Sequence, residues 1–149
     1  MMRKTVTPKI LAELEEEAVS FVEKLAPSEN GATLVTFSGE LGAGKTAFIK
    51  TIAHTLGVEE TVTSPTFVLE KIYKVGHPMS NFKQLIHIDA YRLGKGADLA
   101  PLGFDELMRD SGNLILLEWP EKVLDALPPP AMRVSLVVNP DGSRMITYD

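Results

Sequence analysis

The sequence predicts a single α/β domain over residues 1–149, in which helices flank a mixed β-sheet and a β-hairpin lies at the C-terminus. Three observations predict it. Apolar, β-branched runs typical of buried strands alternate with segments of helical periodicity. A glycine-rich turn joins the first of these strands to a helix. The length of 149 residues suffices for one sizeable core but not for two.

The first element that we expect is an amphipathic helix. Thr7 followed by Pro8 is a start signal, because proline fits the first helical turn, and the pattern ends near Pro27. Apolar residues recur at intervals of three and four positions, namely Ile10, Leu11, Leu14, Ala18, Phe21, Val22 and Leu25.

A strand and a second helix follow. Residues 32–38 (ATLVTFS) are apolar and β-branched, which predicts a buried strand. Helical spacing continues from Lys45 to Leu56, and Gly57 is placed to end that helix. The order is therefore strand, glycine-rich turn, helix.

The rest of the chain mixes strands with short helices. The expected elements are a strand in 61–75 with a break at Ser64-Pro65, a strand in 84–93 that ends near Asp89, one or two short helices in 94–112, a buried strand in 113–120, a short helix in 121–127, and an antiparallel hairpin in 132–148. The first two of these strands could pair as a hairpin across the loop between them.

Composition excludes several classes of function. The net charge of −5 argues against a stand-alone nucleic-acid binder, and we expect no DNA partner. Without cysteine, the chain has no disulfide, zinc-thiolate site or thiol nucleophile. Its apolar runs are too short to span a membrane, and the acidic N-terminal segment is unlike a secretory signal. We therefore expect a cytoplasmic protein.

The glycine-rich turn has the sequence GELGAGKT and matches the Walker A pattern G-x-x-x-x-G-K-[ST]. In such a P-loop, backbone N–H groups converge on phosphate oxygens, and side chains would block that approach. The N-terminus of the following helix points its positive dipole end at the same anion. The sequence thus predicts a P-loop NTPase-like domain whose nucleotide is held by Gly39, Glu40, Leu41, Gly42, Ala43, Gly44, Lys45 and Thr46.

A P-loop protein also needs an acidic group for Mg²⁺ and a group that positions the attacking water. Glu118 directly follows the apolar run 114–117, and Asp89 follows another strand-like run. Parallel strands of one sheet would bring both carboxylates to the edge where the loop lies. The alternatives are a solvated acid for Glu118, and for Asp89 a helix cap or an ion pair with Arg92.

Three further positions carry weaker signals. His87 alternates with isoleucines, and a lone histidine in a strand is more often structural, or a donor to a functional residue, than a catalytic base. Trp119, the single tryptophan, is either a residue beside the site or part of the core. Ser64, Pro65 and Thr66 form either a switch loop that senses the γ phosphate or a plain bend.

Four motifs in this order, GELGAGKTAFIK, SPTFVLEKIY, HIDAYRL and LLEWPEK, resemble the bacterial TsaE (formerly YjeE) family. The resemblance extends from about Gly31 to Lys122. It implies a small P-loop ATPase, slow alone, that acts with the transferase TsaD and its homologue TsaB. These proteins attach threonylcarbamoyl to adenosine 37 of tRNAs that read codons starting with A, so that tRNA is reached only through the complex.

The resemblance also implies a role for individual residues. Lys45 and Thr46 would hold the phosphates of ATP and Mg²⁺, and Glu118 would ligate Mg²⁺. Asp89 would orient water or the water shell of the metal. Thr66 and Trp119 would be nearby switch and lid residues. Lys45, Asp89 and Glu118 are thus the expected catalytic residues.

Two other functions stay open from the residues alone. A small-molecule P-loop kinase would need an arginine-bearing lid, and the five arginines of the chain form no dense segment. A regulatory module would bind the nucleotide without hydrolysing it. A GTPase is disfavoured, because the chain has no Asn-Lys-x-Asp segment to recognise guanine.

Overall fold

A computed structural model of the chain describes residues 4–9, 11–40, 42–60, 62, 69–77 and 80–149. It contains a mixed sheet with the strand order β1-β7-β6-β2-β5-β4-β3. The strands are β1 (Lys4–Val6), β2 (Thr33–Ser38), β3 (Glu70–Lys74), β4 (Gln84–Asp89), β5 (Asn113–Glu118), β6 (Met132–Val138) and β7 (Arg144–Tyr148). This sheet confirms the predicted α/β class.

The centre of the sheet is parallel and its two sides are antiparallel. Strand β2 lies between β5 and β6, and β4 pairs with the other edge of β5, all in parallel. The β3–β4 pair and the β6–β7 pair are antiparallel, as the two expected hairpins require. Strands β2, β4 and β5 therefore end at the same edge of the sheet.

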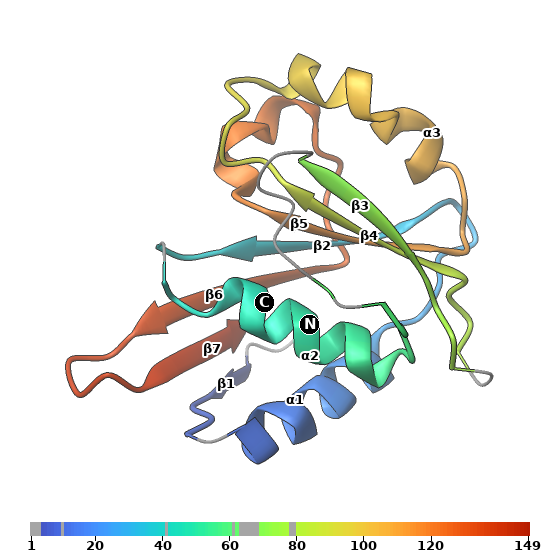
Figure 1. The fold of residues 1–149 in the computed structure, drawn as a ribbon. Helices are drawn as coiled ribbons and strands as arrows, with labels where there is room; N and C mark the ends of the chain where they lie inside the picture. The colour runs from blue at the N-terminus through green and yellow to red at the C-terminus, as the bar shows by residue number, and fades with distance from the viewer. Residues whose placement is uncertain (1–3, 10, 41, 61, 63–68, 78–79) are drawn as a thin grey trace.

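Helices cover both faces of the sheet. The helices α1 (Leu11–Lys24) and α2 (Lys45–Thr55) lie on one face (Figure 1). On the other face lie the 3₁₀-helix η1 (Gly96–Leu102) and the short helix α3 (Phe104–Met108). No described helix is long and apolar enough to cross a lipid bilayer.

Each face of the sheet has its own apolar core. On the α1–α2 face, Phe21, Phe37, Phe48 and Tyr148 form an aromatic cluster with ring centroids 5.6–6.4 Å apart. Phe48 lies in the first turn of α2 and is fully buried, so this cluster fixes the start of α2 against β2. Aromatic pairs at such distances stabilise a core beyond their buried area alone.

Three local features differ from the sequence-based expectation. The first helix was expected to start at Thr7-Pro8, but both residues precede α1, which begins at Leu11. Strand β1 was not expected, and it extends the sheet by pairing with β7, where the hydroxyls of Thr5 and Thr147 lie 3.3 Å apart. The short helix expected in 121–127 is instead two 3₁₀ turns, Pro120–Lys122 and Leu124–Ala126. They are separate because the buried Val123, with φ −135°, interrupts the helical path.

Candidate functional site

The glycine-rich turn connects β2 to α2, as predicted, and its glycines adopt conformations that other residues rarely reach. Gly39, Gly42 and Gly44 have φ values of +146°, +81° and +97°. A Cβ atom at Gly39 would lie 2.5 Å from the carbonyl oxygen of Leu136, so the close approach of the two backbones requires glycine there. Around Gly42, by contrast, a Cβ would meet no described atom within 4 Å. Among the described residues, that side of Gly42 faces open space.

Helix α2 begins at Lys45, directly after Gly44, and the first-turn N–H groups of a helix have no partner within it. The Lys45 ammonium donates a hydrogen bond to the carbonyl of Gly39 and lies 3.7 Å from the centre of the Trp119 ring. Burial lowers the pKa of Lys45, and the nearby charges of Glu118, Glu121 and Asp89 act in the opposite direction. The lysine is therefore held over the loop in an acidic environment.

The two predicted carboxylates meet at the edge of the sheet that carries the loop. Asp89 ends β4 and pairs in register with Glu118, which ends β5. Both side chains lie on the α2 face, because they alternate with Ile88 and Leu117 of the opposite core. Burial raises the pKa of Asp89, and the backbone N–H of Tyr91, 3.0 Å from its Oδ1, opposes that shift.

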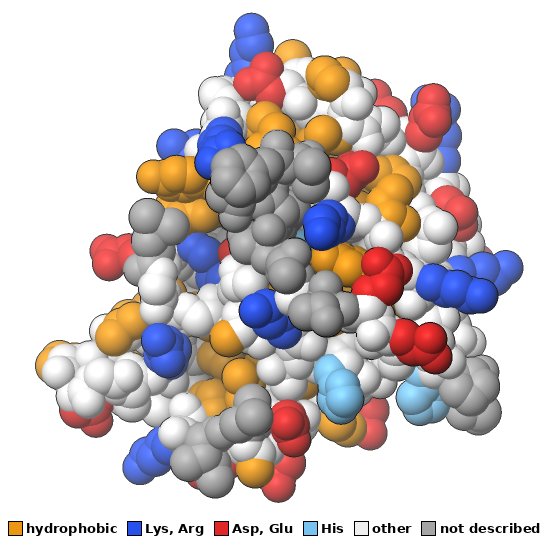
Figure 2. Space-filling model, viewed as in Figure 1, with side chains coloured by type: hydrophobic (Ala, Val, Ile, Leu, Met, Phe, Trp, Pro, Cys, Tyr) orange, Lys and Arg blue, Asp and Glu red, His pale blue; other side chains and the backbone are white. Residues whose placement is uncertain are grey.

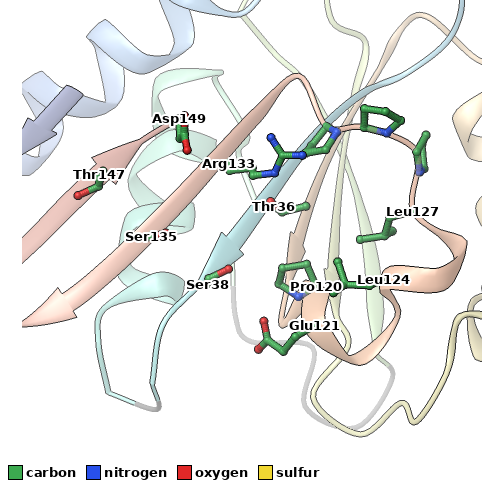
Figure 3. Close-up of a pocket in the computed structure, with 13 residues that line it drawn as sticks. Thr36, Ser38, Pro120, Glu121, Leu124, Leu127, Arg133, Ser135, Thr147 and Asp149 are labelled. Atoms are coloured by element: carbon green, nitrogen blue, oxygen red, sulfur yellow. The ribbon is translucent and has the colours of Figure 1, made fainter. Parts of the chain in front are cut away.

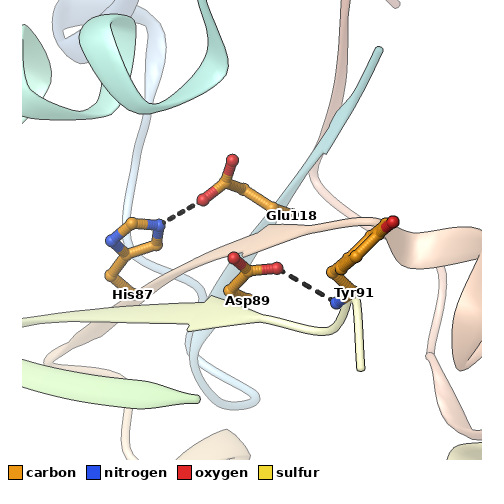
Figure 4. Close-up of polar contacts among 4 residues, drawn as sticks. All are labelled: His87, Asp89, Tyr91 and Glu118. Carbon is orange, nitrogen blue, oxygen red and sulfur yellow. Dashed lines mark hydrogen bonds and ion pairs between the residues drawn. The ribbon is translucent and has the colours of Figure 1, made fainter. Parts of the chain in front are cut away.

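Glu118 is a buried acid rather than a solvated one. It is 3% exposed, and its Oε2 lies 2.7 Å from Nε2 of the fully buried His87 (Figure 4). The same view shows Asp89 bonded to the backbone of Tyr91 rather than capping a helix. The histidine thus contacts the acid directly, which sequence reasoning left open.

The other predicted residues surround this edge or lie outside the described part of the chain. Thr46 is the second residue of α2 and is partly exposed. Ala43 is buried, whereas Glu40 is exposed. Trp119 is partly buried and its ring centroid lies 5.0 Å from that of the more exposed Tyr91. Leu41 and Thr66 lie outside the described residues.

Arg144 also reaches the loop, and sequence reasoning missed it. Its Nη2 donates to the carbonyl oxygen of Gly42 at 3.3 Å, although the two residues are 102 positions apart. A Cβ at Gly44 would lie 2.9 Å from Cδ of Arg144. No local sequence signal marks this contact, because only the pairing of β6 with β2 brings the C-terminal hairpin to the loop.

The site offers ligands suited to a polyphosphate and Mg²⁺. The open space beside Gly42 leaves room for an anion, and the start of α2 supplies N–H donors. Oxygen atoms of Thr46, Asp89 and Glu118 are the kind of ligand that Mg²⁺ takes. Among the described residues, no three His, Asp or Glu side chains form a metal cage. Mg²⁺ bound jointly by one or two carboxylates and a nucleotide requires none.

The described residues line two hollows beside the loop. One, of about 630 Å³, adjoins Gly44 and Ala47 and extends between α1 and the C-terminal hairpin, where Pro8, Leu14 and Arg144 line it. The other, of about 470 Å³, is lined by Thr36, Ser38, Arg133 and the 3₁₀ turns after β5 (Figure 3). It includes neither the loop glycines nor Lys45, so only the first hollow is continuous with the start of α2.

Known proteins are similar to this chain over most of its length. The family described as "Threonylcarbamoyl adenosine biosynthesis protein TsaE" matches residues 12–146. The tRNA threonylcarbamoyladenosine biosynthesis protein TsaE of Rickettsia felis is 39% identical over 132 residues, which are 88% of this chain and 73% of that protein. The Bacillus subtilis protein of the same name is 32% identical over 89% of this chain and 79% of its own length.

The fold is shared with a solved structure. The crystal structure of Bacillus subtilis YdiB superposes with a TM-score of 0.73 and 26% sequence identity, over 99% of this chain and 84% of that one. The sheet and its helices therefore have an experimental counterpart.

Proposed function

This chain belongs to the TsaE family, and we propose that it binds and hydrolyses ATP in the biosynthesis of threonylcarbamoyladenosine. It acts with TsaD and TsaB, which attach the threonylcarbamoyl group to adenosine 37 of tRNAs that read codons starting with A. The chain is then a single P-loop ATPase domain that works in the cytoplasm.

One observation carries the ATPase proposal. The glycine loop, Lys45 and the carboxylates of Asp89 and Glu118 meet at one edge of the sheet, although they come from three separate segments. This is the arrangement that phosphoryl transfer from a nucleotide needs, because catalysis there depends mainly on positioning and on charge stabilisation.

Each residue has a distinct role in the proposed reaction. The backbone N–H groups of the loop and of the α2 N-terminus bind the phosphate oxygens. Lys45 exchanges its contact with the Gly39 carbonyl for the β and γ phosphates. Thr46 and Glu118 would hold Mg²⁺, and Asp89 would orient the attacking water or the water shell of the metal. When bound there, Mg²⁺ would supply positive charge that offsets the negative charge developing on the phosphates.

The nucleoside part of ATP is proposed to enter the hollow of about 630 Å³ beside Gly44 and Ala47. Pro8 and Leu14 give this hollow an apolar wall against which a base can pack, and Arg144 supplies a cation near the loop. Trp119, together with Thr66 outside the described residues, is proposed to flank the γ phosphate.

The charge of the chain supports an indirect contact with tRNA. The net charge is −5, and Lys and Arg side chains are interspersed with acidic ones on the face shown in Figure 2. A protein that gripped tRNA alone would need a continuous basic surface. TsaD and TsaB are therefore proposed to hold the tRNA.

The direct test compares Lys45→Ala with Lys50→Ala, an exposed lysine of the same helix. Phosphate release from ATP, measured with TsaD and TsaB present, should fall about 100-fold in Lys45→Ala and stay unchanged in Lys50→Ala. Equal activity of the two variants would refute the site. ATP binding without phosphate release would instead favour a regulatory module, and a phosphorylated small-molecule product would favour a kinase.

A further inference from the structure

His87 has no role in the function proposed so far, yet its environment is unusual for a polar side chain. It is fully buried in β4, between Ile86 and Ile88. Burying an imidazole is costly unless it is hydrogen-bonded. The one side-chain hydrogen bond of His87 among the described residues is with the Glu118 carboxylate, and Nδ1 has no hydrogen-bond partner there.

The direction of this hydrogen bond follows from the chemistry of the two groups. An ionised carboxylate only accepts hydrogen bonds, so opposite such a group Nε2 of His87 bears the hydrogen and donates a hydrogen bond to Oε2 of Glu118. The separation of 2.7 Å is in the range of hydrogen bonds to charged groups, which are stronger than neutral ones. One oxygen of Glu118 is therefore occupied, and Figure 4 shows the other directed away from the imidazole.

Without this bond, Glu118 would have a competing partner. Its charge acts on Lys45, the residue proposed to hold the β and γ phosphates. A Glu118 side chain released from His87 could turn toward the ammonium, and an ion pair there would withdraw both groups from nucleotide and metal. His87 can prevent this, because its hydrogen bond from the neighbouring strand β4 fixes the position of the Glu118 carboxylate.

We propose that His87 is a positioning residue that fixes the Glu118 carboxylate for Mg²⁺ binding and keeps it apart from Lys45. This inference rests on the proposed function, in which Glu118 ligates the metal. Residues that hold a metal ligand in place typically contribute 10- to 100-fold to metal affinity or activity.

The test uses two amide variants that differ by one methylene group. The amide nitrogen of His87→Gln can reach the position of Nε2, whereas that of His87→Asn stops short of it. The Mg²⁺ concentration that gives half-maximal ATP binding, measured by calorimetry, should rise about 10- to 100-fold in His87→Asn. It should stay within about threefold of the parent in His87→Gln, and ATP affinity in EDTA should not change in either.

A purely structural role makes a different prediction. If His87 were purely structural, its substitution would lower the stability measured by urea unfolding and leave the Mg²⁺ dependence of ATP binding unchanged. In a Glu118→Gln background, His87→Asn should have no further effect on Mg²⁺ dependence, because the histidine acts through that carboxylate. Should His87→Asn fail to fold, His87→Leu removes the donor while keeping the apolar volume, and the same shift is expected.

The outcomes separate the two proposals. A parent protein that binds ATP no better with Mg²⁺ than with EDTA overturns the proposed metal site and, with it, the role of His87. A parent that responds to Mg²⁺, with His87→Asn or His87→Leu responding identically, overturns only the role of His87.

Discussion

Alanine substitutions at two glycines can separate the effect of the glycine-rich turn on nucleotide binding from its effect on stability. Gly42 and Gly103 both have positive φ, +81° and +74°, and a Cβ at either would meet no described atom within 4 Å. Alanine at each position should therefore cost a similar conformational free energy, about 1–2 kcal/mol of stability. Only at Gly42 does the added methyl group enter the space proposed for the phosphates.

Gly42→Ala should therefore weaken ATP binding at least tenfold, which corresponds to about 1.4 kcal/mol. Gly103→Ala should lose stability alone, because Gly103 joins η1 to α3 on the opposite face of the sheet. Urea unfolding measures the stability of both variants, and calorimetric titration with Mg²⁺-ATP measures the affinity. Two outcomes would show that the loop does not need glycine at position 42 to bind phosphate. One is that Gly42→Ala binds ATP with an affinity within twofold of the parent, and the other is that Gly103→Ala loses as much ATP affinity as Gly42→Ala.

Three further outcomes are expected. Ala47→Trp should fill the hollow beside α2 and, in competition assays, weaken the binding of ATP far more than the binding of tripolyphosphate. His54→Trp, at the exposed far end of α2, should change the affinity for neither ligand. Phe48→Ala should lower the free energy of unfolding by about 3–5 kcal/mol in urea, because Phe48 is fully buried in the aromatic cluster; a loss below 1 kcal/mol would contradict this packing. Burial raises the pKa of Glu70, so the ionised carboxylate opposes folding once the pH exceeds its unfolded pKa, and Glu70→Gln should be more stable than the parent at pH 7. That advantage should fade toward about pH 4, and an advantage that grows on acidification would contradict the sign.

The sequence predicted the centre of the molecule because the signals there are local. The Walker pattern lies between an apolar strand and a helix with regular spacing, and both formed as expected. The pairing of Asp89 with Glu118 was also predictable, since parallel strands of similar length end at one edge.

Other features depend on contacts that no short segment encodes. Strand β1 has three residues, and in the described part of the chain it pairs only with β7, at the opposite end of the sequence. Arg144 meets Gly42 across 102 positions. The His87–Glu118 hydrogen bond depends on the register between β4 and β5. That register pairs Asp89 with Glu118, and His87, two residues before Asp89, points to the same face of the sheet.

The most direct measurement of the central claim is the response of backbone amides to the nucleotide. In ¹H–¹⁵N NMR spectra, addition of Mg²⁺-ATP should shift the amide resonances of Gly42, Gly44 and Lys45 strongly, because their N–H groups bind the phosphates. The resonances of α3 should stay in place. Unchanged loop resonances at saturating Mg²⁺-ATP would contradict the account, even if ATP bound elsewhere on the protein.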